Sequence, residues 1–594
     1  MKKALMFSLL AAVMLAASAP AKLSKTAPAR FDKPITGTES LADIPCYPTR
    51  PGLITQSPGE VIGSTFYDYQ TNGSTGNRVA ACDDGSFVFC WMNLPGWPAP
   101  TYPRHVYFNC LSPTGDWYSQ GIGGSVSTQA GCGYTNLDVI YGNRAAIGYH
   151  LYGASPYVIQ ANDIDPPCLG FFDYYDPPDE IFPQNQDNPG RMYWPYITVD
   201  RNDNIHVAMS EDVPGLGHFQ RMCYTNSTDG GATWAEIQLV DTIMVISSVL
   251  DASPVSDKVV LAYSKTQDTS SQVRNDIVYV LSEDGTTWDF RYGKVNITNY
   301  GDDPDSLWAY TDVDVIFDYN DNFHIVWTES WTSADGGSYF RTDIKHFDEV
   351  SGEITTAVPT HVDSTWYDIC GVWNKPVCKM SLGVCPQSPH GLVMTYTRFD
   401  TTDISSGGYG NGEIYMTYSL DDGAIWAPDT NLTDSPTPDC FPGECDSDHW
   451  STLSDELDDS LHIIYINDKD AGGIPQTEGV ATDNPVMYMT SPNPIWETGI
   501  KNNTNRPLNF DLGQNYPNPF NARTTISFTL KEAAPVTIDV FNLLGAQVAT
   551  LADEVMEIGP HSIVWDASEA ASGIYYYRLS TGDQSETRQA VMIK

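Results

Sequence analysis

The sequence predicts an all-β protein, a β-propeller followed by a small C-terminal β-sandwich of the immunoglobulin-like kind. Between about residue 65 and residue 494, one strand–turn–strand pattern returns roughly every 60 residues, whereas helical periodicity is nearly absent. The last part of the chain instead carries separate runs in which apolar and polar residues alternate, as in half-buried strands. Repeats of this size built only from strands indicate a propeller of about seven blades, with six as the alternative.

The N-terminus has the pattern of a secretory signal peptide. An apolar run follows Lys2 and Lys3, and Ala19-Pro20-Ala21 fits a cleavage site. We therefore assign residues 1–21 to a signal peptide and residues 22–60 to an N-terminal segment before the propeller. No later stretch is apolar for long enough to cross a bilayer, so no membrane-spanning segment is expected in the exported chain.

The composition is globular and strongly acidic. The chain has 75 acidic and 31 basic residues, with 41% hydrophobic and 12% aromatic residues. This charge argues against nucleic acid or anionic membranes as partners, because phosphate binding needs clustered lysine and arginine. High solubility is the simpler consequence of the acidic surface.

Twelve cysteines in an exported chain predict disulfide bonds. None of them has a zinc-binding spacing. We interpret Cys440 and Cys445 as a staple within one loop, and the group Cys370, Cys378 and Cys385 in the same way. The sequence leaves the connectivity open.

Each repeat contains an apolar strand, an acidic turn and a second apolar strand. Three copies are clear and four are weaker. The clear copies are residues 197–207, 315–325 and 453–463, and the weaker ones are Val79–Trp91, Leu137–His150, Val249–Ser264 and Met380–Thr397. We assign residues 61–494 to the propeller.

Several repeats also carry a turn with the order Ser, Asp, Gly, Trp. Good copies begin at Ser227, Ser282 and Ser419, and a degenerate copy begins at Ser112. Ser and Asp can hydrogen-bond the turn backbone, Gly can take a positive φ, and the Trp ring can pin the hairpin to its blade. The turn resembles the Asp-box, or BNR, repeat of sialidase-like propellers. In that family the box is structural and lies away from the ligand face, so the resemblance implies no ligand contact by these residues.

Three histidines recur at one position of the repeat, His206, His324 and His462. Such recurrence favours a role in the fold, as packed or solvated strand residues, over a metal site that joins the three on the propeller axis. No metal-binding, nucleophile or phosphate-loop motif is present. We therefore expect no cofactor and no metal, and no motif supports a structural calcium ion.

The candidate ligand site lies in aromatic segments that precede the innermost strands. Loops normally carry small polar residues, whereas these combine tryptophan and tyrosine with aspartate and arginine. Such a combination suits a carbohydrate or protein ligand, and the alternative is that each ring only caps its blade. The candidate residues are Arg78, Arg191, Tyr193, Trp194, Trp308, Tyr310, Trp366, Asp368, Asp448, His449 and Trp450. If they bind a ligand, the four tryptophans among them should line an open groove.

The propeller resemblance also implies an alternative function, that of a sialidase-like glycoside hydrolase. That family uses three arginines for the substrate carboxylate, a Tyr–Glu nucleophile pair and an acid aspartate. Arg78, Arg191 and Arg398 could serve as arginines, but Asn77-Arg78-Val79-Ala80 lacks the Phe and Pro of the family motif. No residue pattern pairs a Tyr with a Glu, so no catalytic residue is assigned.

The tail from Asn509 predicts a separate module after a linker at residues 495–508. Five pieces of it are informative and occur in a fixed order. They are Gln514-Asn515-Tyr516-Pro517-Asn518-Pro519-Phe520-Asn521, Leu544-Gly545, Gly559-Pro560-His561, Val564-Trp565-Asp566 and Ser572-Gly573-Ile574-Tyr575. Together they resemble the type A C-terminal sorting domain of the Bacteroidetes type IX secretion system, which we assign to residues 509–594. The resemblance implies passage through the periplasm, contact with the type IX secretion machinery, and a location on the outer membrane surface or outside the cell.

These observations favour a secreted or surface-attached binding module without catalytic activity, with carbohydrate or protein as its ligand. A sialidase-like glycoside hydrolase is one alternative, and a structural or adhesive surface protein is another.

Overall fold

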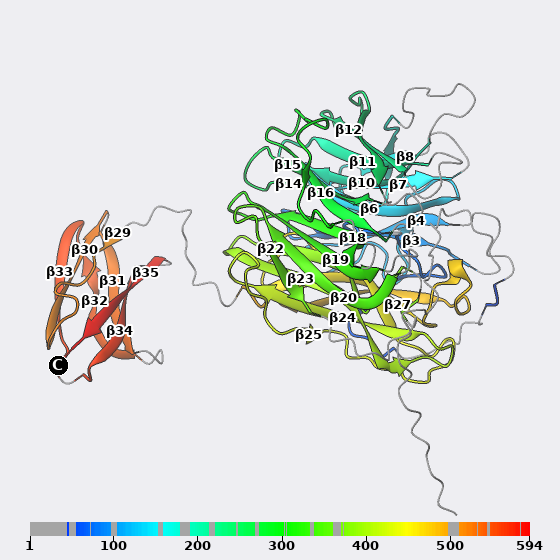
Figure 1. Cartoon of the computed structure of the whole chain (residues 1–594). Helices are drawn as coiled ribbons and strands as arrows, with labels where there is room; N and C mark the ends of the chain where they lie inside the picture. Colours follow the sequence, from blue (N-terminus) through cyan, green and yellow to red (C-terminus); the bar gives the residue numbers. More distant parts are fainter. Residues whose placement is uncertain are drawn as a thin grey trace, which may run out of the picture. The chain divides into compact units, whose positions relative to one another are not determined.

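The structure is a computed structural model of the chain (Figure 1). It describes residues 44–46, 55–71, 73–96, 104–152, 158–178, 191–212, 220–244, 247–267, 273–301, 303, 306–332, 338–359, 370–371, 373–496, 510–531, 533–542, 547–568, 570–581 and 584–593. The chain divides into two compact units, Met1–Trp496 and Glu497–Lys594. The described part is almost entirely β-structure, and its one short 3-10 helix is η1 (Ile474–Gln476).

The strands of the first unit lie in groups of four, each an antiparallel meander (Figure 1). The first three groups are β2 (Val79–Ala81), β3 (Phe87–Asn93), β4 (His105–Leu111) and β5 (Gly124–Ser125); β6 (Cys132–Ile140), β7 (Arg144–Leu151), β8 (Val158–Asp163) and β9 (Phe172–Tyr175); and β10 (Arg191–Val199), β11 (Ile205–Asp212), β12 (Gln220–Ser227) and β13 (Gln238–Met244). The next two are β14 (Ser248–Ala252), β15 (Val259–Thr266), β16 (Asn275–Ser282) and β17 (Val295–Asn296); and β18 (Leu307–Phe317), β19 (Phe323–Thr332), β20 (Ser338–Asp348) and β21 (Ile354–Val358). A single residue pair, Asn275 with Ala309, joins these two groups into one eight-stranded sheet.

The last two groups complete the propeller-like ring. They are β22 (Val377–Cys385), β23 (Ser388–Ile404), β24 (Gly410–Ser419) and β25 (Thr430–Asn431); and β26 (Ser447–Leu453), β27 (Ser460–Asp468), β28 (Asn484–Pro492) and β1 (Glu60–Thr65). The first described strand thus pairs with the last strand of the unit, with Glu60 opposite Tyr488 and Thr65 opposite Asn484. This pairing closes the ring, because strands from the two ends of the unit lie in one sheet.

The sequence repeat corresponds to one part of each group. Every copy covers the hairpin between the first and second strands, and the first strands are named the inner strands below: β2, β6, β10, β14, β18, β22 and β26. The inner strands β22 and β26 are buried at every residue, because both of their faces are covered.

The chain between β1 and β2 runs through the centre of the ring. Residues 73–78, named the axial segment, bond to inner strands on several sides of the ring. Ser74 Oγ donates to Val313 O on β18 at 2.6 Å, and Thr75 Oγ1 donates to Met380 O on β22 at 3.3 Å. Arg78 Nε donates to Thr452 Oγ1 on β26 at 3.1 Å. The segment therefore fills the axis and ties the inner strands to one another.

The Ser-Asp-Gly-Trp turns connect the third and fourth strands of their groups, and they have the expected hydrogen bonds. Ser227 Oγ donates to Asp229 Oδ1 at 2.9 Å, and that oxygen accepts the Thr233 N–H at 2.7 Å. Asp421 accepts the Ile425 N–H in the same way at 2.9 Å. The aspartate carboxylates thus stabilise the turn through these hydrogen bonds.

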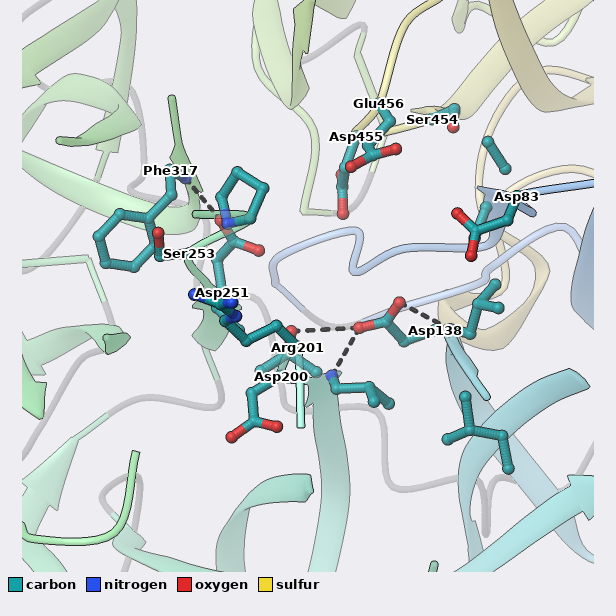
Figure 2. Close-up of a pocket in the computed structure, with 18 of the residues that line it drawn as sticks. Asp83, Asp138, Asp200, Arg201, Asp251, Ser253, Phe317, Ser454, Asp455 and Glu456 are labelled. Atoms are coloured by element: carbon teal, nitrogen blue, oxygen red, sulfur yellow. Dashed lines mark hydrogen bonds between the residues drawn. The ribbon is translucent and has the colours of Figure 1, made fainter. Parts of the chain in front are cut away.

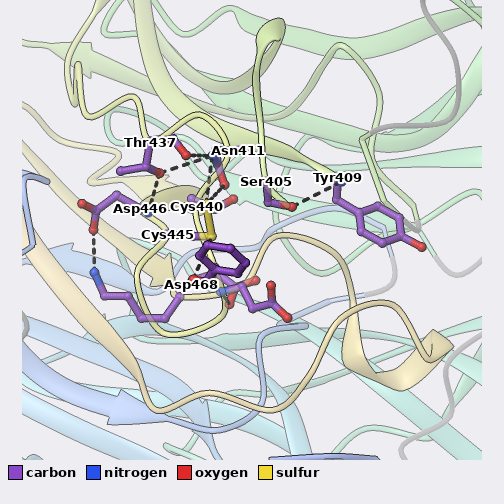
Figure 3. The surroundings of a disulfide bond; sticks show 12 residues. Ser405, Tyr409, Asn411, Thr437, Cys440, Cys445, Asp446 and Asp468 are labelled. Atoms are coloured by element: carbon purple, nitrogen blue, oxygen red, sulfur yellow. Dashed lines mark hydrogen bonds and ion pairs between the residues drawn. A yellow bond between two sulfur atoms is a disulfide. The ribbon is translucent and has the colours of Figure 1, made fainter. Parts of the chain in front are cut away.

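Disulfides are confirmed in part. Cys440 and Cys445 are bonded within one loop, where Asn411 Nδ2 donates to Thr437 O at 3.2 Å and the Asp446 N–H donates to Thr437 Oγ1 at 2.9 Å (Figure 3). The expected staple among Cys370, Cys378 and Cys385 is wrong, because Cys378 and Cys385 are free thiols. A second disulfide instead joins Cys110 on β4 to Cys168.

The second unit contains two sheets, which share one hydrophobic core that includes Phe528, Ile538 and Trp565. The three-stranded sheet is β29 (Phe510–Leu512), β30 (Arg523–Leu530) and β33 (Gly559–Asp566), and the four-stranded sheet is β32 (Gln547–Met556), β31 (Ala534–Asn542), β34 (Gly573–Thr581) and β35 (Gln584–Met592). Ile495, the first residue of the expected linker, is fully buried against the last group of the ring, and the first unit extends to Trp496.

Candidate functional site: an acidic cavity on the ring axis

A cavity of about 630 Å³ lies where the inner strands end. Its lining includes the last residues of inner strands, or the turns that follow them, from all seven groups. Figure 2 shows Asp83, Asp138, Asp455 and Glu456 around the same space, each held by a different part of the chain except the last two. The repeat therefore places its acidic turns together, because equivalent positions of every blade meet at the axis.

The charge of the lining is strongly negative. Its acidic side chains are Asp83, Asp138, Asp200, Asp203, Asp251, Asp455 and Glu456. Its guanidinium, on Arg201, is half-exposed and already donates to Val255 O at 2.9 Å. The cavity therefore favours cationic or hydroxyl-bearing ligands and repels anionic ones.

Some of these carboxylates hold neighbouring inner strands together. Asp138 Oδ2 accepts the Val199 N–H on β10 at 2.6 Å and the Thr198 hydroxyl at 3.2 Å. Asp251 Oδ2 accepts the Phe317 N–H on β18 at 2.5 Å. These bonds satisfy amide groups that face the axis and have no strand partner on that side.

Burial shifts the acidity of the same carboxyls. It raises the pKa of Asp138 to about 6, although the Val199 and Val139 N–H groups oppose the shift. It raises the pKa of Asp251 well above the usual range, as does the nearby charge of Asp138. The pKa of Asp455 is raised well above the usual range as well, first by burial and then by the charge of Asp251. Carboxyls that can be protonated near neutral pH occur together here, which is common at binding and catalytic sites.

The remaining lining adds aromatic and hydroxyl groups. Tyr141 is 78% exposed at the rim, and the Tyr319 hydroxyl donates to Glu456 Oε1 at 2.9 Å. The Ser454 side chain is fully buried, and its hydroxyl has no hydrogen-bond partner among the described residues. A buried hydroxyl without a partner costs free energy, so a ligand or water that bonds it would be stabilised.

Those of the sequence-predicted site residues whose side chains the structure describes lie at the opposite ends of the inner strands, and they are buried. The Trp194, Trp308 and Trp450 rings are 3%, 4% and 1% exposed, so none offers a stacking face to solvent. Five further candidates are buried as well, namely Arg78, Tyr193, Tyr310, Asp448 and His449. Arg191 lies on β10, but its side chain is outside the described residues, as are Trp366 and Asp368 entirely. The expected open groove is not formed by the three described tryptophans.

The burial of these rings has a structural cause. Four inner strands carry a β-bulge whose register break surrounds a bulky residue with positive φ, namely Tyr134, Trp194, Lys379 and Trp450. A β-bulge changes the direction of side chains, and here it points these four side chains into the interior of the propeller-like ring. There they meet residues that follow β1, as in the edge contact of Tyr69 with Trp450, whose ring centres are 4.9 Å apart. These residues are thus on strands and in a core, and not in loops as the sequence predicted.

The arginines of the sialidase hypothesis are not brought together among the described residues. Arg78 is buried in the axial segment and bonds to the Trp450 carbonyl and to Thr452. Arg398 lies on β23, where it pairs with Asp429 at 2.8 Å beside a separate cavity of about 660 Å³.

The comparison with known families decides the nature of the tail. Residues 514–594 match the family model of the secretion system C-terminal sorting domain. The chain therefore carries a type IX secretion sorting domain, which implies contact with the type IX machinery and export to the cell surface or the extracellular space. No helix among the described residues has the length and hydrophobicity to cross a membrane.

Solved structures resemble the chain weakly. An ulvan lyase of polysaccharide lyase family PL25 is 11% identical, with a TM-score of 0.45, and the match covers 75% of this chain and 99% of that chain. The polysaccharide lyase Uly1 is 9% identical, with a TM-score of 0.44, and coverage of 74% and 98%. The GH93 α-L-arabinofuranosidase of Fusarium graminearum is 14% identical, with a TM-score of 0.35, and coverage of 60% and 92%. No curated protein matches the sequence. These similarities are too low to say anything about activity.

The acidic cavity was not among the sites expected from the sequence. Each repeat shows an acidic turn, but the sequence alone assigned no function to its carboxylates. The informative signal is the presence of acidic residues that the turn does not require, such as Asp455 and Glu456 after β26 and Asp138 within β6. Equivalent positions in a propeller converge on the axis, so such additional acidic residues predict a negatively charged opening of the central channel.

Proposed function

We propose that this exported protein is a binding module whose acidic cavity holds a neutral or amine-bearing carbohydrate. The single observation that supports this proposal is the axial cavity of about 630 Å³, in which the inner-strand ends of all seven groups meet. Concave sites with a few convergent polar groups and shifted acidities are the usual location of ligands.

The chemistry of the lining supports that ligand class. Acidic side chains such as Asp83 and Glu456 accept hydrogen bonds from sugar hydroxyls or ammonium groups, and charged acceptors make the stronger bonds. The exposed ring of Tyr141 offers an apolar face for the C–H side of a sugar. Sialic acid and other acidic sugars would meet seven carboxylates, so the sialidase hypothesis gains no support from this cavity.

Glycoside hydrolysis is a second candidate function, and the raised pKa of Asp138 favours it. A glycosidase needs one carboxyl that stays protonated near neutral pH and a second that is ionised. Burial raises the pKa of Asp138 to about 6, and other carboxyls lie in the same cavity.

The experiment is a binding screen of the exported chain against neutral, amino and acidic oligosaccharides, followed by calorimetry on the best ligand. Two exposed lining residues give variants that should fold, Glu456→Gln and Tyr141→Ala. Loss of a charged hydrogen bond should weaken binding about tenfold in Glu456→Gln. The matched controls are Glu236→Gln and Tyr292→Ala, at exposed positions outside the cavity lining.

The outcomes separate the alternatives. Equal affinities of the lining variants and the wild type would exclude the cavity as the ligand site, and a preference for acidic sugars would exclude the ligand class. Binding of a basic peptide in place of sugars would show a protein ligand, and no binding to either would leave the adhesive or structural role. Release of sugars from the best ligand, abolished in Asp138→Asn, would show hydrolysis.

A further inference from the structure

A second cluster of ligating side chains lies between two neighbouring groups of the ring, outside the lining of the axial cavity. Asp318 follows β18, His324 lies on β19, and Asp422 lies in the turn after β24. One carboxylate oxygen of each aspartate and one ring nitrogen of the histidine are all within 4.8 Å of one another. Asp318 and His324 are buried, whereas the Asp422 side chain is 35% exposed.

A chain of hydrogen bonds fixes the protonation of His324. The Thr355 hydroxyl donates to Gly423 O at 2.8 Å, so its oxygen accepts from His346 Nδ1 at 3.3 Å. Since Nδ1 of this imidazole is the donor, its Nε2 is the acceptor. That acceptor lies 3.1 Å from His324 Nδ1, which must therefore carry the proton. His324 Nε2 is left with a lone pair.

This lone pair faces a carboxylate. His324 Nε2 lies 3.7 Å from Asp318 Oδ2, and it has no hydrogen-bond partner among the described residues. Two electron-rich atoms that face each other in a buried position repel, unless a cation lies between them. The third ligand, Asp422, adds another carboxylate to the same point.

The equivalent histidines of the repeat have the opposite arrangement. His206 Nε2 donates to Asp200 Oδ2 at 3.4 Å, and its Nδ1 accepts from the Tyr224 hydroxyl at 2.6 Å. His462 is held in the same way, by an aspartate on one nitrogen and a tyrosine hydroxyl on the other. In both groups every ring nitrogen has a partner.

The difference arises at one strand position. Tyr224 pairs across the sheet with Ala208, two residues after His206, and His346 pairs with Val326, two residues after His324. Replacing a tyrosine hydroxyl, which donates, by His346 Nε2, which accepts, reverses the proton on the repeat histidine. Of the three repeat histidines, His324 is thus the one whose Nε2 atom is available to a metal.

The neighbouring turn completes the cluster. Gly423 has no room for a side chain, since a Cβ there would lie 2.0 Å from the His346 ring, and this close approach sets Asp422 beside His324. His390, which is 62% exposed, lies 3.0 Å from the Asp422 carboxylate on the solvent side and can orient it. An ion could enter along this exposed side.

We propose that Asp318, His324 and Asp422 bind one divalent transition-metal ion of the zinc type, which links two neighbouring groups of the ring. An imidazole nitrogen with two carboxylates suits zinc, whereas calcium prefers an all-oxygen set. The sequence alone predicted no metal, because the ligands come from two separate hairpins that the spacing of residues does not connect.

The test is zinc binding by the full chain after removal of metals, followed by elemental analysis and unfolding temperature. We expect one zinc ion per chain, visible absorption bands on replacement by Co²⁺, and a higher Tm with zinc. Asp422→Asn, at a partly exposed position, should weaken zinc binding at least about tenfold.

His206→Gln is the matched control, because it changes the equivalent histidine in another group and should leave zinc affinity unchanged. His324→Gln should lose the site, and Asp422→Asn keeps the test valid if His324→Gln fails to fold. The proposal is overturned if the wild type binds no zinc, if Asp422→Asn and His206→Gln bind alike, or if Ca²⁺ but not Zn²⁺ raises the Tm.

Discussion

The carboxylate of Asp138 on β6 accepts the backbone N–H of Val199 on the next inner strand, β10, at 2.6 Å. This bond joins two groups of the ring across the axis-facing side, where no strand pairing exists. The same carboxyl lines the acidic cavity, so one residue serves both the fold and the candidate site.

The pH dependence of this contact can be measured with Asp138→Asn. Burial raises the Asp138 pKa to about 6 from 3.8, so folding adds a proton between these values. The stabilising contribution of the residue is therefore fullest below about pH 4 and is lost as the pH rises through about 6. Urea unfolding should show the variant most destabilised relative to wild type near pH 4 and least destabilised above pH 7. A difference that is constant with pH would contradict the assignment.

The axial segment should tolerate no side chain at Gly73. A Cβ there would lie 1.8 Å from Ser247 Oγ and 3.0 Å from Thr311 O. We expect Gly73→Ala to lower the free energy of unfolding by about 1–3 kcal/mol, since overpacking forces neighbours to move. Gly301→Ala is the control, because its Cβ would meet nothing within 4 Å. Similar unfolding curves for both variants would show that the segment is not confined.

The two disulfides should differ in their contribution to stability. Cys110 and Cys168 are 58 residues apart, whereas Cys440 and Cys445 are 5 residues apart. The longer loop restricts the unfolded chain more, by about 2 kcal/mol in the chain-entropy model. Replacing both members of each pair by alanine should therefore lower the unfolding free energy more for the Cys110 pair. The reverse order in denaturant unfolding would contradict this expectation.

The buried tryptophans should matter for stability and not for ligand binding. Trp450→Ala removes a ring that is 1% exposed, which should cost about 3–5 kcal/mol of unfolding free energy. Ligand affinity of the folded fraction, measured by calorimetry well below the melting temperature, should not change. A large loss of affinity with little loss of stability would return the ligand site to the aromatic end of the inner strands.

The repeat and the tail could be predicted from sequence because each depends on local patterns. The alternation around Ile197 and Val315 fixes strands, and the Ser-Asp-Gly-Trp turns depend only on residues a few positions apart. The motifs of the tail are similarly local, and the family match confirms them.

The candidate site could not be predicted because it depends on bulges and on contacts between distant residues. Trp194 and Trp450 occur where a loop is expected, and only the register breaks of β10 and β26 turn them inward. The acidity of Asp138 depends on burial, and the zinc ligands depend on a turn from another group. None of these can be read from the spacing of residue types.

The closure of the ring has a consequence for the order of folding. Tyr465 donates to the Pro58 carbonyl across 407 residues of chain, and β1 pairs with β28 at a similar separation. Contacts of such long range form slowly, because the intervening chain must first be confined. The pairing of β1 with β28 must therefore wait for almost the whole unit to be synthesised, although the axial segment is made before any of the inner strands.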